Sequence, residues 1–117
     1  MTASFPSGDE LAKTLVKIAR MADERSGAVK FAVNGACVLS ASSTDVGKAS
    51  ATVKASINHS GDVSEIVTGF NSAYVLDALK VAGKNPVVLS LIDAQSAGVF
   101  TVPSLPEYSY MIMPMRL

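Results

Sequence analysis

The chain has 117 residues with ten basic and ten acidic side chains, and 49% of its residues are hydrophobic while 17% are charged. This length suits one domain with a substantial core, and the apolar excess predicts that part of the surface is an interface. The zero net charge excludes nucleic-acid binding driven by overall charge, so any such role requires clustered basic side chains.

A short strand around residues 3–6 precedes the clearest predicted helix, which spans residues 7–27. Ser7 or Asp9 can cap this helix, and the acidic residues of its first turn suit the positive end of the helix dipole. Gly27 is its predicted end. Apolar residues recur at helical spacing and mark the side that we expect to be buried: Leu11, Leu15, Ile18 and Ala22.

Four strand segments are predicted between the two helices. Residues 28–42 form a hairpin, in which Asn34 and Gly35 suit the positive φ angles of a type I′ turn. Residues 48–57 alternate polar and apolar side chains, as a half-exposed strand does, and residues 63–70 form the next strand.

A second helix is predicted to begin at its cap, Asn71, and to end at Gly83 and Pro86. Its buried stripe comprises Val75, Leu79 and Ala82. Three strands follow, at residues 87–92, 99–102 and 108–113. The order predicts an α+β fold, with a sheet on one side and both helices on the other, in which a helix followed by strands occurs twice.

Local signatures of enzyme chemistry are missing, so we expect no enzymatic activity. His59 is the only histidine and lies in a predicted turn, which favours solvent exposure over a catalytic role. Cys37 is interpreted as a buried, inert thiol. The sequence contains no phosphate-binding loop and no zinc-ligand spacing, and we therefore expect no cofactor and no metal.

The expected location is the cytoplasm. A single cysteine excludes an internal disulfide framework and fits a reducing compartment. No apolar run approaches the ~20 residues of a membrane span, and the first ten residues lack the basic start and apolar centre of a signal peptide.

Lys13, Lys17 and Arg20 form a basic stripe opposite the apolar side of the first helix. On pattern alone, an ordinary solvated helix face is the commoner explanation of such a stripe. The alternative is a surface that faces the phosphates of DNA, and Lys80 and Lys84 on the second helix, one turn apart, favour it. Such contacts would be non-specific and sensitive to salt.

Residues 69–83 contain Gly-Phe-Asn before a helix, a Tyr three residues after that Asn, and Val-Leu-Asp-Ala-Leu. Together with the terminal Met-Pro-Met-Arg-Leu, this segment closely resembles the C-terminal end of the bacterial DNA polymerase III beta subunit, the sliding clamp. Residues 8–31 resemble the first helix and strand of the same domain, with less identity. The resemblance spans essentially the whole chain and implies a single clamp domain of the third, C-terminal type over residues 1–117.

The resemblance implies the DNA clamp domain fold, with two helices packed on one side of antiparallel β-sheets and a pseudo-two-fold internal repeat. It also implies a processivity or tethering factor for DNA replication that contacts double-stranded DNA without reading its sequence. The helices of this family line the inner wall of a ring, so the residues expected to face DNA are Lys13, Lys17, Arg20, Lys80 and Lys84.

Residues 110–117 end the chain on an apolar segment, although chain ends are usually polar. The resemblance implies a hydrophobic groove here, into which DNA polymerase, the clamp loader or repair proteins insert a short linear motif. A terminal strand that covers the core is the simpler alternative. The expected groove residues are Asn71, Tyr74, Met111, Met113, Pro114, Met115, Arg116 and Leu117, with Ser96 and Ala97 as looser candidates.

Family members carry three such domains, and two subunits make a six-domain ring, whereas this sequence has one domain and half of the groove. We therefore weigh three hypotheses. The first is a clamp-type factor that self-associates into a homo-oligomeric ring by head-to-tail contacts. The second is a solitary peptide-binding module that competes for clamp-binding motifs. The third is a truncated or excised domain of a longer clamp.

Overall fold

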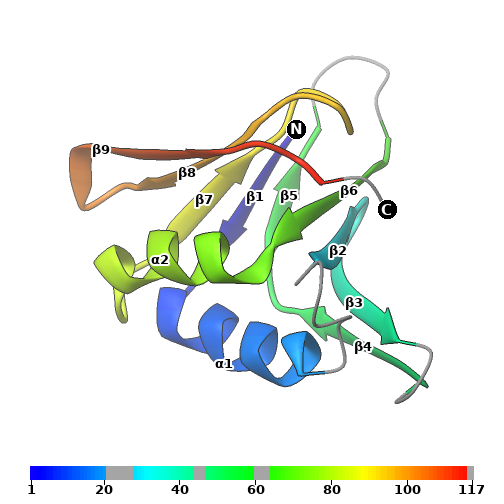
Figure 1. The fold of residues 1–117 in the computed structure, drawn as a ribbon. Coiled ribbons are helices and arrows are strands. Elements are labelled where there is room, and N and C mark those ends of the chain that lie inside the picture. The colour runs from blue at the N-terminus through cyan, green and yellow to red at the C-terminus, as the bar shows by residue number, and fades with distance from the viewer. Residues whose placement is uncertain (21–27, 44–46, 60–63, 116–117) are drawn as a thin grey trace.

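The computed structural model describes residues 1–20, 28–43, 47–59 and 64–115. In this part of the chain, the elements in order are β1 (Thr2–Phe5), α1 (Gly8–Ala19), β2 (Ala28–Val33), β3 (Cys37–Ser43), β4 (Gly47–Val53), β5 (Ser56–Asn58), β6 (Ile66–Asn71), α2 (Ser72–Ala82), β7 (Val87–Ser90), β8 (Gly98–Val102) and β9 (Leu105–Ile112). Figure 1 shows the two helices side by side at the bottom of the view, below the strands of the larger sheet.

The strands form two antiparallel sheets, in the orders β4-β3-β2-β6 and β5-β1-β7-β8-β9. The four-stranded sheet contains β2, β3 and β4, which follow α1, together with β6, the strand that leads into α2. The five-stranded sheet contains β7, β8 and β9, which follow α2, together with β1, the strand that leads into α1, and the short edge strand β5. The strand that begins each half of the chain therefore lies in the sheet of the other half. This arrangement confirms the α+β class and the pseudo-two-fold repeat.

Helix α1 begins as predicted, because the Ser7 side chain accepts a hydrogen bond from the backbone N–H of Glu10 at 3.4 Å. Leu11, Leu15 and Ile18 are buried. The α-helix ends at Ala19, earlier than predicted, and residues 21–27, with the predicted Ala22 and Gly27, lie outside the described residues.

The predicted turn type of the first hairpin is wrong. Neither Asn34 nor Gly35 has a positive φ angle. Val33 pairs with Cys37, so the connection is longer than a two-residue turn. The Asn34 side chain accepts a hydrogen bond from the Ala36 N–H at 3.0 Å, and this contact closes the loop without a left-handed backbone.

The single strand predicted over residues 48–57 is two strands. Strand β4 ends at Val53, and β5 begins at Ser56 in the other sheet, where it pairs with β1. The prediction failed because polar and apolar side chains keep alternating through the break, and alternation does not report a change of partner strand.

The core lies between the sheets and the helices and is built on four fully buried rings: Phe5, Phe31, Phe70 and Phe100. The rings of Phe31 and Phe70 meet edge to face, with centroids 5.4 Å apart. Cys37 is also buried, as the sequence predicted, and burial raises the pKa of its thiol to about 12.

The start of α1 packs against the end of α2. The N–H groups of Gly8 and Asp9 donate to the carbonyls of Asn85 and Gly83, at 3.0 and 2.7 Å. A Cβ atom on Gly8 would lie 2.8 Å from the Ala82 Cβ and 2.9 Å from the Gly83 oxygen. This close approach fixes the two helices as neighbours in one layer.

Replacing Gly8 with Ala is expected to lower the free energy of unfolding by about 1–3 kcal/mol, because the methyl group overpacks the helix junction. Urea denaturation followed by circular dichroism would measure the change. Gly35→Ala is the matched control, since a Cβ at Gly35 meets nothing within 4 Å. Equal stability of the two variants would contradict the proposed clash.

Candidate functional site: the basic helix face and the carboxyl-terminal tail

The predicted basic stripe on α1 is exposed. Lys13, Lys17 and Arg20 all lie on the solvent side of the helix, opposite its buried residues, with the partly exposed Val16 among them. Within the described ranges, no carboxylate forms an ion pair with these three cations. Their charge is therefore available for an anionic partner.

The basic residues predicted on α2 are placed differently. Lys80 is exposed, but its ammonium lies 3.4 Å from the Asp77 carboxylate one turn earlier. Lys84 is also exposed and follows Gly83, the residue that ends α2 with a φ of 56°. The prediction that Lys84 lies one helical turn after Lys80 is therefore wrong, because the helix has already ended. Most of the unpaired cationic charge of the two helices lies on α1.

The carboxyl-terminal tail connects the two sheets. After β9 ends at Ile112, the chain leaves the five-stranded sheet and runs to β6, an edge strand of the other sheet (Figure 1). There the N–H of Met115 donates to the carbonyl of Gly69 at 2.7 Å, in an isolated antiparallel bridge. Arg116 and Leu117 lie outside the described residues.

The loop between β7 and β8 is anchored beside the tail. Thr68, the residue before Gly69, is 2% exposed, and its hydroxyl donates to the carbonyl of Ala94 at 3.1 Å. The Asp93 carboxylate accepts hydrogen bonds from the N–H groups of Gln95 and Ser96, at 2.9 and 2.7 Å. Hydrogen bonds from the Ser96 side chain and from these two N–H groups hold the pKa of Asp93 below its usual range.

Adjacent residues of β6 therefore hold both the tail and this loop. Ser96 and Ala97, the looser groove candidates, are half-buried in the loop. Local sequence patterns gave no signal for the Thr68–Ala94 contact, because a threonine in a strand is ordinary and its partner lies 26 positions away.

At the end of β9 and directly after it, the side chains alternate between the core and the solvent. Ile112 is buried, whereas Met111 and Met113 are 69% and 66% exposed. A terminal strand that only covers the core does not account for two exposed methionines, although Ile112 does cover it. Pro114 and Met115 are half-buried.

Tyr74 and Asn71 belong to the start of α2, which directly follows β6. Tyr74 is 54% exposed, and the Asn71 side-chain oxygen caps the helix by accepting from the Ala73 N–H at 2.9 Å. The amide oxygen of Asn71 thus has a structural role. We call Tyr74, Met111, Met113, Pro114 and Met115 together the tail surface.

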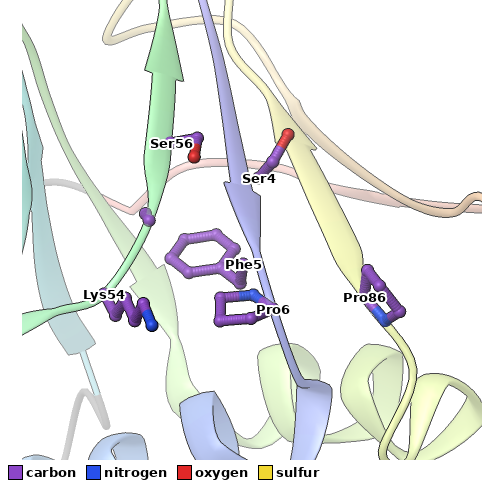
Figure 2. Close-up of a pocket in the computed structure, with 7 residues that line it drawn as sticks. Ser4, Phe5, Pro6, Lys54, Ser56 and Pro86 are labelled. Atoms are coloured by element: carbon purple, nitrogen blue, oxygen red, sulfur yellow. The ribbon is translucent and has the colours of Figure 1, made fainter.

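Sequence reasoning did not indicate two surface pockets. One, of about 280 Å³, lies between the end of β1, the start of β5 and the start of β7, as Figure 2 shows. Its lining includes Ser4, Phe5, Pro6, Lys54, Ser56 and Pro86. Hydroxyl groups, one amine and proline rings share this pocket, and no pair of them makes a catalytic arrangement.

The other pocket, of about 420 Å³, lies where the end of α2 meets the start of β9. Val81, Leu105 and Glu107 are among the residues that line it, and Val81 and Leu105 are each 44% exposed. Tyr108 closes one side, with its hydroxyl donating to the Ala78 carbonyl at 3.1 Å, and burial raises its pKa. Part of the apolar excess of the sequence is therefore on the surface here.

Among the residues that the structure describes, no three His, Cys, Asp or Glu side chains come together in a group that could hold a metal ion. Neither of the two helices in this part of the chain is long and apolar enough to cross a membrane.

Residues 3–116 match the family model described as "DNA polymerase III beta subunit, C-terminal domain". A beta sliding clamp of Pseudomonas putida is 39% identical over 62 residues, which make up 53% of this chain and 16% of that protein. The chain thus spans a small part of the relatives that it matches.

Solved sliding clamps share the fold. The clamp of Pseudomonas aeruginosa bound to griselimycin is 24% identical, with a TM-score of 0.88, and the match covers 99% of this chain and 31% of that chain. The beta sliding clamp of C. crescentus is 26% identical, with a TM-score of 0.87, over 99% of this chain and 30% of that chain.

Proposed function

Because the chain belongs to the family of the DNA polymerase III beta subunit, C-terminal domain, we propose that it acts as a clamp-type processivity or tethering factor in DNA replication. In this proposal residues 1–117 form one clamp domain without catalytic activity of its own. The observation that carries the proposal is the tail, which is bonded to Gly69 and yet leaves Met111 and Met113 open to solvent.

We propose that α1 faces the DNA backbone. The exposure of Lys13, Lys17 and Arg20 and their lack of a described ion-pair partner support this role. Lys80 and Lys84 contribute less, since Lys80 shares its charge with Asp77. Lysine and arginine over phosphates respond to charge and not to base identity, so the chain binds duplexes of any sequence.

The tail surface binds a short linear motif of a DNA polymerase, a clamp loader or a repair protein. Methionine side chains repack around different apolar anchors, the Tyr74 ring offers a flat wall, and Pro114 restricts the backbone. By family resemblance, Asn71, Arg116 and Leu117 complete this site. The two anchors on β6, Thr68 and Gly69, hold its base in place before a partner arrives.

Copies of the chain associate head to tail into a ring. Strands β4 and β9 are edges of different sheets, so each offers unpaired backbone groups to a neighbour. The β9 edge adjoins the pocket that contains Val81, Leu105 and Glu107, and the β4 edge carries the exposed Lys48. Unlike edges with opposite charges suit a heterologous contact, which closes into a ring when the rotation allows it. In a longer parent protein, neighbouring domains take the place of these copies.

A solitary peptide-binding module is the second candidate. It is favoured by the exposure of the tail surface in a single chain, which requires no ring and no DNA.

Replacing Lys13, Lys17 and Arg20 with Glu is expected to weaken binding to a duplex of mixed sequence by about tenfold or more. The slope of the logarithm of the affinity against the logarithm of the salt concentration should become shallower by about 2–3, because about three phosphate contacts are lost. Fluorescence anisotropy across salt concentrations measures both effects. The control replaces Lys30 on β2 and Lys54 on the connection between β4 and β5 with Glu, and the losses of the two variants are compared per reversed charge. Equal losses in both variants would contradict a specific role for α1.

Removing residues 115–117 is expected to weaken binding of a labelled peptide that carries a clamp-binding motif by about tenfold or more, since the Met115 anchor is lost. Griselimycin, which is bound to the P. aeruginosa clamp, serves as a second probe in the same anisotropy assay, by competition. Val81→Ala truncates an exposed apolar side chain at the other end of α2 and should bind both probes normally. Normal binding by the shortened chain would refute the tail site.

Light scattering of the concentrated chain is expected to give a mass above the 12.1 kDa of one copy. Leu105→Asp should shift the mass toward a single copy, because it places a charge in the apolar pocket beside β9. Ile92→Asp introduces the same charge at another exposed apolar residue and should not. A single-copy mass for the unchanged chain at all concentrations would exclude the ring and leave the peptide module.

A further inference from the structure

Met111 and Met113 differ from the other described methionines in their exposure. Their side chains are 69% and 66% exposed, whereas Met1 and Met115 are half-buried. Met111 lies on β9, an edge strand with a neighbour on one side only, and Met113 follows directly after the strand ends at Ile112. The cross-strand partner of Met111 is Val99, which pairs in turn with Ser90, and these small side chains do not cover a thioether.

Exposure decides which sulfur atoms an oxidant reaches first. Cys37, the single cysteine, competes poorly, because it is buried and its thiol remains protonated. The thioethers of Met111 and Met113 are therefore the most accessible sulfur atoms in the part of the chain that the structure describes.

We propose that Met111 and Met113 form an oxidation site for peroxides, and that their conversion to sulfoxides releases the peptide from the tail surface. The inference rests on the proposed peptide binding. A sulfur lone pair attacks one peroxide oxygen, the O–O bond breaks, and an S–O bond forms. With hydrogen peroxide, proton transfer to the departing oxygen yields water. Each sulfur loses two electrons, and the peroxide gains them.

The sulfoxide acts on binding without acting on the fold. The sulfoxide oxygen is a strong hydrogen-bond acceptor. An apolar peptide side chain that covers this oxygen would remove it from water without offering a hydrogen-bond donor, and this loss weakens binding. Ile112, between the two methionines, keeps its place in the core, and the tail remains held by a backbone hydrogen bond from Met115 to Gly69. Partner release is therefore separable from unfolding.

The test treats the full chain with hydrogen peroxide and then maps each methionine by peptide mass spectrometry. Anisotropy with the labelled clamp-motif peptide follows on the same samples. We expect Met111 and Met113 to be oxidised before Met1 and Met115, the peptide affinity to fall by about tenfold or more, and the thermal midpoint to stay unchanged. Methionine sulfoxide reductases with a thiol reductant should restore binding, and bound peptide should slow the oxidation.

The matched control replaces Met111 and Met113 with Leu, which keeps the apolar volume and removes the thioether. Peroxide treatment should leave the peptide affinity of this variant at its value before treatment, whatever that value is, whereas the wild-type chain loses affinity. Equal binding by oxidised and reduced wild-type chain, or continued sensitivity of the Leu variant, would overturn the proposal, as would earlier oxidation of Met1 or Met115. Failure of the reduced wild-type chain to bind any peptide would instead refute the proposed peptide site. The proposal that oxidation releases a bound peptide would then be refuted as well.

Discussion

The close approach of the first helix to the end of the second is the constraint on which the remaining arrangement depends. Gly8 allows it, because any side chain at this position would meet Ala82 and the Gly83 carbonyl. The N–H groups at the start of α1 then satisfy carbonyls that follow α2, so the positive end of one helix dipole lies against the negative end of the other. With the helices fixed in one layer, the stripe of Lys13, Lys17 and Arg20 is left facing solvent as a continuous surface.

Because the strand that begins each half of the chain lies in the sheet of the other half, segments that are distant in the sequence meet on one strand. Strand β6 belongs to the sheet of the first half and leads directly into the helix of the second half. Thr68 and Gly69 on this strand hold the β7–β8 loop and the chain's tail side by side. The tail surface is thus assembled from α2, β9 and the tail on a base, β6, that belongs to the same half of the chain but lies in the sheet of the other half.

Local chemistry allowed much of this fold to be predicted, including the helix caps Ser7 and Asn71 and the buried stripes of both helices. It failed where the outcome depends on a partner far away in sequence. The alternation through Val53 and Ser56 continues although the strand changes sheet, and an asparagine side chain replaced the expected backbone turn at Asn34. Of the candidate site, the exposed lysines followed from helical spacing and the groove residues came only from family resemblance. The Met115–Gly69 bridge left no local trace in the sequence.

The burial of Cys37 makes the chain convenient for labelling chemistry. It is the single cysteine of the sequence, it lies at the start of β3 inside the core, and its thiol has a pKa of about 12. A maleimide should reach it only when the core opens, so its modification rate reports the frequency of opening events. A cysteine introduced on the surface can then carry a fluorophore in the native protein with little background from the core.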